Sequence, residues 1–465
     1  MIWRLTHLEL AILRRDRRAW GALLALASLI LLSFLAIATQ NVRSDADKQA
    51  VAAAERARWV GQGEKDPHSA AHYSIFAFKP SPALAALDPG SESFVGQTVW
   101  LEAHHQNDML YRPQQNASLL QRIGFAAPAA LITGFAPLII FLIAFTLVAQ
   151  DRERGTMRVA LGAAIHPRMI VGAKALTVWC ASTGLLLLPV TAGSLLWLGL
   201  GGRLDGDTAL RMICWALVMA SYFAFLAAVG IAVSLRMANA RLALTALFGL
   251  WIFFALALPR VASGMVDAAR PLPSSQSVRQ EIAEAAPAFW SDEQNARNRA
   301  KLLARYGVTR VEDIPNPRMA ELDLVERHSH EVFDRILGGF YGRVAAQDRL
   351  FAAFGFLSPT IAAQAASASV AGSDFSHHRD FIDSAERYRR DLVNRMNADG
   401  MGHRAHGTER HTNDDKLWSQ VPEFAYPTPP LGRFAGTALP AFMALLAWLA
   451  IGGLLLITAA RRLRP

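Results

Sequence analysis

Six segments of this sequence are long, strongly apolar and free of charged and histidine side chains. A helix needs about 20 residues to cross the roughly 30 Å hydrocarbon core of a bilayer, where the backbone must satisfy its own hydrogen bonds. The segments comprise residues 20–39, 127–149, 175–200, 212–235, 242–259 and 434–460. They predict an all-α integral membrane protein with six transmembrane helices.

Basic residues cluster beside one end of these segments. If the N-terminus is cytoplasmic, the cytoplasmic parts hold fifteen Lys and Arg residues and four acidic residues, whereas the whole chain has a net charge of +9. The positive-inside rule therefore favours a multi-pass membrane protein with both termini cytoplasmic, including a short tail at 461–465.

The basic pI of 9.9 is thus a signal of topology. Its arginines lie next to the membrane ends, where lipid headgroups are their natural partners, so we expect no nucleic-acid partner. Charged residues make up only 18% of the chain, and the two cysteines, Cys180 and Cys214, fall inside predicted spans. A disulfide framework and a cysteine-based zinc site are therefore excluded.

Two segments allow other interpretations. Ala36-Ile37-Ala38 resembles a signal-peptide cleavage site, but the preceding apolar run is longer than a usual signal core, so we expect a retained span. Residues 350–373 carry no charge and are long enough to cross, but a seventh crossing would place the basic C-terminus outside. We expect this segment to lie along the outer membrane surface or to pack under an outer domain.

Two predicted extracytoplasmic loops, 40–126 and 260–433, are too long to be unstructured in a compact protein. Residues 45–60 form a helix candidate. Apolar residues at steps of three and four predict further helices; they are Leu322, Val325, Val332, Ile336, Phe340 and Val344, then Phe381, Ala385, Tyr388, Leu392 and Met396. Together the loops predict a mainly helical extracytoplasmic domain, with a polar, His-rich, mobile loop at 400–413.

The first 19 residues form an amphipathic segment. Ile2, Leu5, Leu8 and Ile12 share one helical face, and arginines occupy the other. Such a helix lies in the headgroup plane, so residues 1–19 are predicted to be an interfacial elbow helix.

Motifs of several enzyme classes are absent from the sequence. There is no Gly-Lys dipeptide and hence no P-loop, no H-E-x-x-H zinc-protease motif and no G-x-S-x-G nucleophile elbow. The uncharged spans also lack the groups of an ion or proton relay. We therefore expect a non-catalytic chain that binds no cofactor itself.

Eleven of the thirteen histidines lie in the two long loops. Imidazole is a common ligand of zinc and copper, and His403, His406 and His411 are spaced so that two or three rings could surround one ion. The alternative is a flexible polar loop whose histidines are incidental. We expect no stoichiometric metal site there.

The segment between the second and third spans, residues 150–174, combines turn chemistry with charge. It contains Asp151-Arg152-Glu153-Arg154-Gly155-Thr156-Met157-Arg158, a short apolar stretch and then Lys174 at the start of the third span. A charged cluster, a glycine and a short helix predict a structured cytoplasmic elbow.

Here the sequence resembles the ABC-2 type permeases of ABC transporters. In that family an acidic residue followed by Gly-Thr ends the second span, and a basic residue precedes the third. Glu153, Gly155 and Thr156 stand at the E-x-G-T positions, and Lys174 at the basic position. The six spans and the N-terminal helix agree, and the large outer loops resemble an uncharacterised subfamily.

The resemblance implies a transport function. A separate ABC ATPase subunit, which binds ATP and Mg²⁺, would dock on the elbow through a surface including Glu153, Gly155, Thr156, Arg158 and Lys174. A second permease, identical or homologous, would complete the transporter. The expected activity is export of a substrate across the inner membrane.

Two alternatives belong to other functional classes. A membrane-bound glycosyltransferase would use Asp45 and Asp47, after the first span, as catalytic acids. A receptor or scaffold would use the outer helical domain to bind a partner. An ABC ATPase encoded by a neighbouring gene would favour the transporter.

Overall fold

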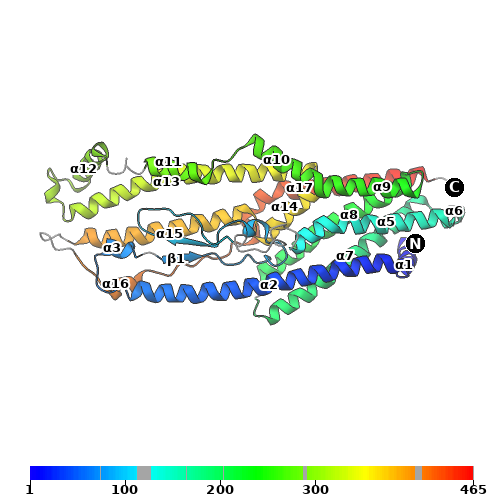
Figure 1. Cartoon of the computed structure of the whole chain (residues 1–465), viewed down its shortest axis with the longest axis horizontal. Helices are drawn as coiled ribbons and strands as arrows, with labels where there is room; N and C mark the ends of the chain where they lie inside the picture. Colours follow the sequence, from blue (N-terminus) through cyan, green and yellow to red (C-terminus); the bar gives the residue numbers. More distant parts are fainter. Residues whose placement is uncertain are drawn as a thin grey trace.

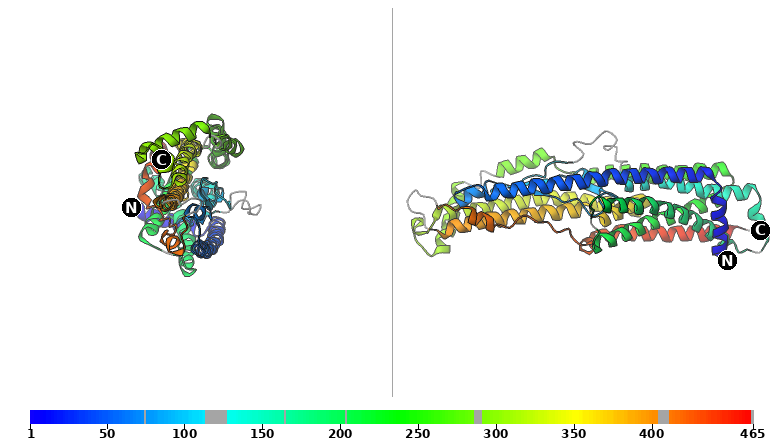
Figure 2. Two further views of the ribbon diagram at one scale, coloured as in Figure 1. Left: turned by 90° about the vertical axis from the view of Figure 1, so that its left-hand side faces the viewer. Right: turned by 90° about the horizontal axis from the view of Figure 1, so that it is seen from below.

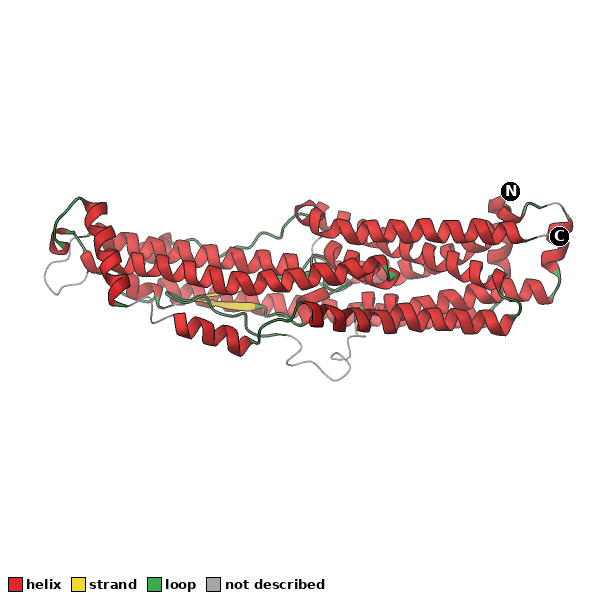
Figure 3. Cartoon of the chain, turned by 90° about the horizontal axis from the view of Figure 1, so that it is seen from above, coloured by secondary structure: helices red, strands yellow, loops and turns green. Residues whose placement is uncertain are grey.

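The computed structural model is an elongated, predominantly helical molecule (Figures 1 and 3). It describes residues 1–73, 75–112, 127–163, 165–202, 204–285, 291–403 and 411–463. Both chain ends lie at one end of the long axis, here called the terminal end (Figure 1). The described parts of residues 40–126 and 260–433 form most of the other end, here called the distal domain, except for a helical hairpin described below.

Among the described residues, six helices are long and apolar enough to cross a membrane, as the sequence predicts. They are α2 (Arg17–Val60), α5 (Pro128–Glu153), α7 (Pro167–Gly199), α8 (Gly206–Arg236), the continuous run α9 (Ala240–Trp251), η3 (Ile252–Ala257) and α10 (Leu258–Ala269), and α17 (Ala435–Arg462). The segment η3 is a π-helix in the middle of the fifth span. Helices α5 and α8 are the most buried of the six and form the centre of the bundle.

Close packing at the centre of the bundle depends on small residues. A Cβ atom added at Gly230 of α8 would lie 2.6 Å from the Cβ of Ala144 on α5, which is closer than atoms can approach. Small residues of this kind let transmembrane helices approach closely, because helix association in lipid depends on packing.

The first two helices differ from the predicted boundaries. Helix α1 (Ile2–Leu13) lies crosswise at the terminal end (Figure 2), and Asp16 caps the start of α2 by accepting hydrogen bonds from the backbone N–H groups of Arg18 and Ala19. The helix that contains the first span does not end near residue 39: α2 is 44 residues long in total, continues into the distal domain and includes the helix expected at 45–60.

The described part of the distal domain is mainly helical, with one small sheet. Its helices are α3 (Pro67–Ala71), α11 (Ser275–Ala285), α12 (Asp292–Tyr306), most of α13 (Pro317–Ala353), α15 (Phe375–Gly402) and α16 (Asp415–Gln420), with the short 3₁₀ turns η1 (Gly90–Ser93) and η5 (Val311–Asp313). The two apolar stripes predicted from the sequence lie on α13 and α15. Strands β1 (Ile75–Phe78) and β2 (Thr98–Leu101) pair antiparallel, with Ile75 opposite Leu101. No strand is predicted from the sequence.

Residues 350–373 form a helical hairpin that enters the bundle. The end of α13, the turn η6 (Phe354–Phe356) and α14 (Pro359–Ala371) pack among α5, α8 and α17. The indole of Trp448, midway along α17, donates a 2.8 Å hydrogen bond to the carbonyl of Gly355. The hairpin therefore reaches the middle of the bundle and does not cross it. Of the two placements expected for this segment, its contacts favour packing under the outer domain.

Polar side chains on α14 explain why the hairpin is stable there. Ser367 accepts a 2.8 Å hydrogen bond from the Trp215 indole, and Thr360 is 3.0 Å from the hydroxyl of Tyr222. Both partners lie on α8. Buried polar groups that find such partners avoid the cost of desolvation, so these two side chains are accommodated inside the bundle.

Candidate functional site

The elbow predicted between the second and third spans is present at the terminal end. Helix α5 ends at Glu153, Gly155 adopts φ 71° and ψ 3°, and the short helix α6 (Thr156–Gly162) follows. The left-handed conformation favours glycine at this position, because other residues are strained there. His166 then caps α7, its Nδ1 accepting a hydrogen bond from the backbone N–H of Arg168.

Lys174 joins three helices beneath the elbow. Its side chain is fully buried, and its Nζ lies 2.7 Å from Glu9 Oε1 of α1 and forms an ion pair with Asp151 of α5. The ammonium also donates a 3.2 Å hydrogen bond to the carbonyl of Leu147. Burial raises the pKa of Glu9, and Lys174 opposes that rise. One cation therefore fixes α1, the end of α5 and the start of α7 relative to one another.

A second contact fixes the elbow to the fourth span. The guanidinium of Arg152 donates hydrogen bonds to the carbonyls of Ser234, Leu235 and Met237, at 2.9 to 3.2 Å. These carbonyls lie at the C-terminal end of α8, where the last carbonyls of a helix lack intrahelical partners and a cation is favourable. Movement of the elbow would therefore displace α5, α7 and α8 together.

The solvent-facing side of the elbow carries mixed chemistry. Glu153, Arg154 and Arg158 are exposed, and Val159 of α6 is 72% exposed. Beside them an open groove of about 530 Å³ runs between the end of α5 and the turn from α8 to α9, lined by residues that include Arg152, Glu153, Asn239 and Arg241. An exposed apolar residue ringed by both signs of charge suits binding of another protein.

The predicted elbow residues thus occupy different positions in the structure. Glu153 and Arg158 face solvent, and Gly155 forms the turn. Lys174 is buried, and its ion pairs fix the end of α5, which leads into the elbow, to α1 and α7. Thr156 does not cap the following helix: its hydroxyl donates a 2.6 Å hydrogen bond to the Asp151 carboxylate, which ties α6 back to α5.

Three residues of the site escaped the sequence analysis as functional candidates. Glu9, Asp151 and Arg152 connect the elbow to its supporting helices. Asp151 and Arg152 flank the recognised motif and could have been included on that ground. Glu9 is separated from Lys174 by 165 residues, and only its position as the single acidic residue of α1 could have drawn notice.

The other predicted candidates lie in the distal domain. His403 and His411 stack with ring centroids 3.6 Å apart, and Asp399 accepts from both of them, while His406 lies outside the described residues. Residues 400–402, expected to belong to a mobile loop, continue helix α15.

Asp45 accepts hydrogen bonds from Lys48 and Ser81, and Asp47 is exposed. Residues two apart on a helix point in different directions, so Asp45 and Asp47 do not form a carboxylate pair.

Comparison with protein families gives a match to part of the chain. The model of a family described as a domain of unknown function, DUF3526, matches residues 277–427, which include most of the distal domain and the α14 hairpin. This family is found in ABC-2 type permease-like proteins. Comparisons with curated proteins and with solved structures give no match.

Proposed function

We propose that this chain is the membrane-spanning permease subunit of an ABC-2 type ABC transporter. It would export a substrate across the bacterial inner membrane, together with a second permease and a separate ATPase subunit that binds ATP and Mg²⁺. The observation that carries the proposal is the elbow: Thr156 ties the short helix α6 to Asp151, and the Lys174 and Arg152 contacts fix the end of α5 to α1, α7 and α8.

Physical reasoning links this arrangement to transport. The ATPase would press on a small surface at the terminal end, and the force has to reach the spans without being absorbed by a flexible loop. Thr156 ties α6 to the end of α5. The buried ion pairs and the bonds to the end of α8 then fix the end of α5 to α7 and α8, so a force on α6 would reach these spans. Glu153 and Arg158 at the surface would set the orientation of the partner, and Val159 would supply apolar contact.

The proposed contact is tested by changing Val159 to Glu. The side chain is 72% exposed, so the substitution has little effect on folding. We expect it to abolish co-purification of the ATPase, or the part of ATP hydrolysis that depends on the permease. Glu153→Arg should weaken the same association, and Gly155→Pro should distort the turn, because proline fixes φ near −65°.

A matched control is Val51→Glu, on the part of α2 that lies in the distal domain. Val51 is 46% exposed and remote from the elbow, and we expect the ATPase to associate normally with this variant. If Val159→Glu and Glu153→Arg both couple to the ATPase as the parent chain does, the elbow is an ordinary loop and the proposal fails.

We further propose that both termini face the cytoplasm and that the distal domain lies outside. This orientation is tested by thiol labelling in a chain whose Cys180 and Cys214 are changed to Ser. Arg297→Cys lies in the distal domain and Ala163→Cys beside the elbow, both at exposed positions. In intact spheroplasts an impermeant thiol reagent should label position 297, whereas position 163 should react only after lysis. The opposite pattern would place the distal domain in the cytoplasm and contradict the assignment.

A further inference from the structure

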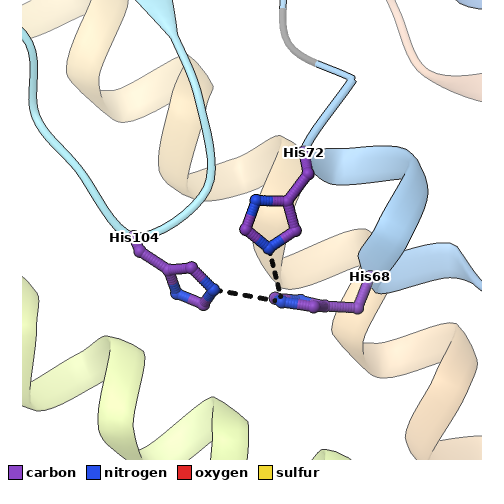
Figure 4. A group of neighbouring side chains, drawn as sticks. All are labelled: His68, His72 and His104. Atoms are coloured by element: carbon purple, nitrogen blue, oxygen red, sulfur yellow. Dashed lines mark hydrogen bonds between the residues drawn. The ribbon is translucent and has the colours of Figure 1, made fainter.

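Three imidazole rings from separate parts of the first long loop converge in the distal domain (Figure 4). The Nε2 atom of His68 lies 3.1 Å from Nε2 of His72 and 3.2 Å from Nε2 of His104. All three nitrogens lie within 4.8 Å of one another. Each ring thus directs the same nitrogen toward one point.

The local fold explains how the rings are placed. Asp66 caps helix α3 through the backbone N–H of Ser69, and Pro67 occupies its first turn. His68 is the second residue of this short helix and His72 is its C-cap, so the two are four residues apart and share one face. His104 follows strand β2 in a turn with φ 68°, a left-handed conformation that is uncommon for a residue other than glycine.

Residues of α13 and α15 hold the opposite side of two of the rings. Nδ1 of His104 lies 3.1 Å from Oε1 of the buried Glu326, and Nδ1 of His68 lies 3.0 Å from Oδ1 of Asn397. The amide nitrogen of Asn397 donates a 2.9 Å hydrogen bond to Oε2 of Glu326, which directs its oxygen toward His68. The Asn397 oxygen carries no proton, so Nδ1 of His68 carries one, and the nearby Glu326 carboxylate favours a proton on Nδ1 of His104 as well.

This proton arrangement leaves lone pairs facing one another. When Nδ1 is protonated in a neutral imidazole, Nε2 is an acceptor, so His68 and His104 present two acceptors 3.2 Å apart. The two lone pairs repel each other. A metal ion bound between the nitrogens would accept both lone pairs and remove this repulsion.

The spacing fits a transition metal. Two imidazole nitrogens bound to one tetrahedral Zn²⁺ at 2.0–2.1 Å are about 3.3 Å apart. The observed separations of 3.1 and 3.2 Å are close to that value. Contacts from Nδ1 to a carboxylate and an amide oxygen are those that orient metal-bound histidines in proteins.

We propose that His68, His72 and His104 bind one divalent transition-metal ion of the zinc class through their Nε2 atoms. Glu326 and Asn397 orient the ligands without touching the ion. His72 is exposed, so a fourth coordination position would open to solvent. Three histidines with an open position leave room for water or an exchangeable ligand.

The second histidine cluster lacks this arrangement. Nε2 of His411 lies 2.9 Å from the Asp399 carboxylate, so a proton on that nitrogen satisfies both groups. Nδ1 of His403 is 2.8 Å from the Asp399 backbone carbonyl. The pair therefore provides a matched control from the same domain.

The site is tested by metal analysis of the purified full-length chain in detergent micelles. After chelator treatment and equilibration with Zn²⁺, the parent should retain about one ion per chain. His72→Ala, at the exposed ligand, should weaken binding at least tenfold, and His68→Ala/His72→Ala should abolish it. Glu326→Gln keeps the shape of the side chain and should weaken binding about 10–100-fold. His403→Ala/His411→Ala should leave the stoichiometry unchanged.

A spectroscopic measurement keeps the test independent of how the variants fold. Co²⁺ added to the stripped parent should give the intense visible absorption of a four-coordinate site with histidine ligands. The absorption should disappear when Zn²⁺ is added. A parent that takes up no Zn²⁺, or one that keeps it in the His68→Ala/His72→Ala variant, would overturn the proposal.

Discussion

Replacing Lys174 with methionine is expected to destabilise the membrane bundle by about 3–5 kcal/mol, because two carboxylates would lose their shared buried cation. The Lys174 side chain is fully buried, and those of Glu9 and Asp151 are 14% and 22% exposed. The loss should appear as a lower midpoint of denaturation in SDS or heat for the purified chain. Lys301→Met, at an exposed position of α12, should have little effect.

The pH dependence of this variant provides a further check. Without Lys174, burial raises the pKa of Glu9 without opposition. A carboxylate whose folded pKa lies above its unfolded value binds more protons when folded, so stability falls as pH rises through that interval. The loss caused by Lys174→Met should therefore be larger at pH 8 than at pH 5. Adding Glu9→Gln should restore part of it at pH 8, and equal losses at both pH values would contradict this account.

Replacing Arg211 with leucine is expected to cost about 3–5 kcal/mol as well, because it leaves buried groups without a partner. The fully buried guanidinium pairs with Asp207 and donates hydrogen bonds to the carbonyls of Val370 and Pro429, at 3.0 and 2.7 Å. Val370 lies in the last turn of α14, where a cation is favourable. Arg211 lies near the start of α8. It thus holds the C-terminal end of α14 and the segment around Pro429, which precedes α17, against that helix.

Hydrogen exchange should locate the damage from Arg211→Leu. Amides of α14 and the start of α15 should exchange faster, whereas those of α12 should be unchanged. Arg297→Leu is a matched control, because its ion pair with Glu293 has side chains 61% and 78% exposed. Removing such a helical pair costs about 0.3–0.5 kcal/mol. Similar losses in the two variants would show that Arg211 does not hold the hairpin.

The six spans and most distal helices could be predicted from the sequence because their signals are local. A run without charges shows its length directly, and the stripes of α13 and α15 repeat within a few turns. The α14 hairpin could not be predicted in the same way. The groups that satisfy Ser367 and Thr360 lie 138 to 152 residues away on α8.

The two polar clusters show the same limit. The motif containing Glu153 and Gly155 predicted the elbow turn, but no local pattern places Glu9 of α1 beside Lys174. The four-residue spacing of His68 and His72 was a usable signal of a shared helical face, whereas His104 joins them only through the pairing of β1 with β2. Glu326 and Asn397 come from the second long loop, so tertiary structure alone brings them to these rings.

The length of α2 has a mechanical consequence. At 1.5 Å per residue its 44 residues measure about 66 Å. Near its far end, the indole of Trp59 donates a 3.0 Å hydrogen bond to the carbonyl of Trp418. As a rigid lever arm of that length, α2 tilted by about 5° at its base would carry its tip by roughly 6 Å. Because the α14 hairpin anchors the same domain inside the bundle, such a displacement would have to shear the distal helices past one another or move them with the spans.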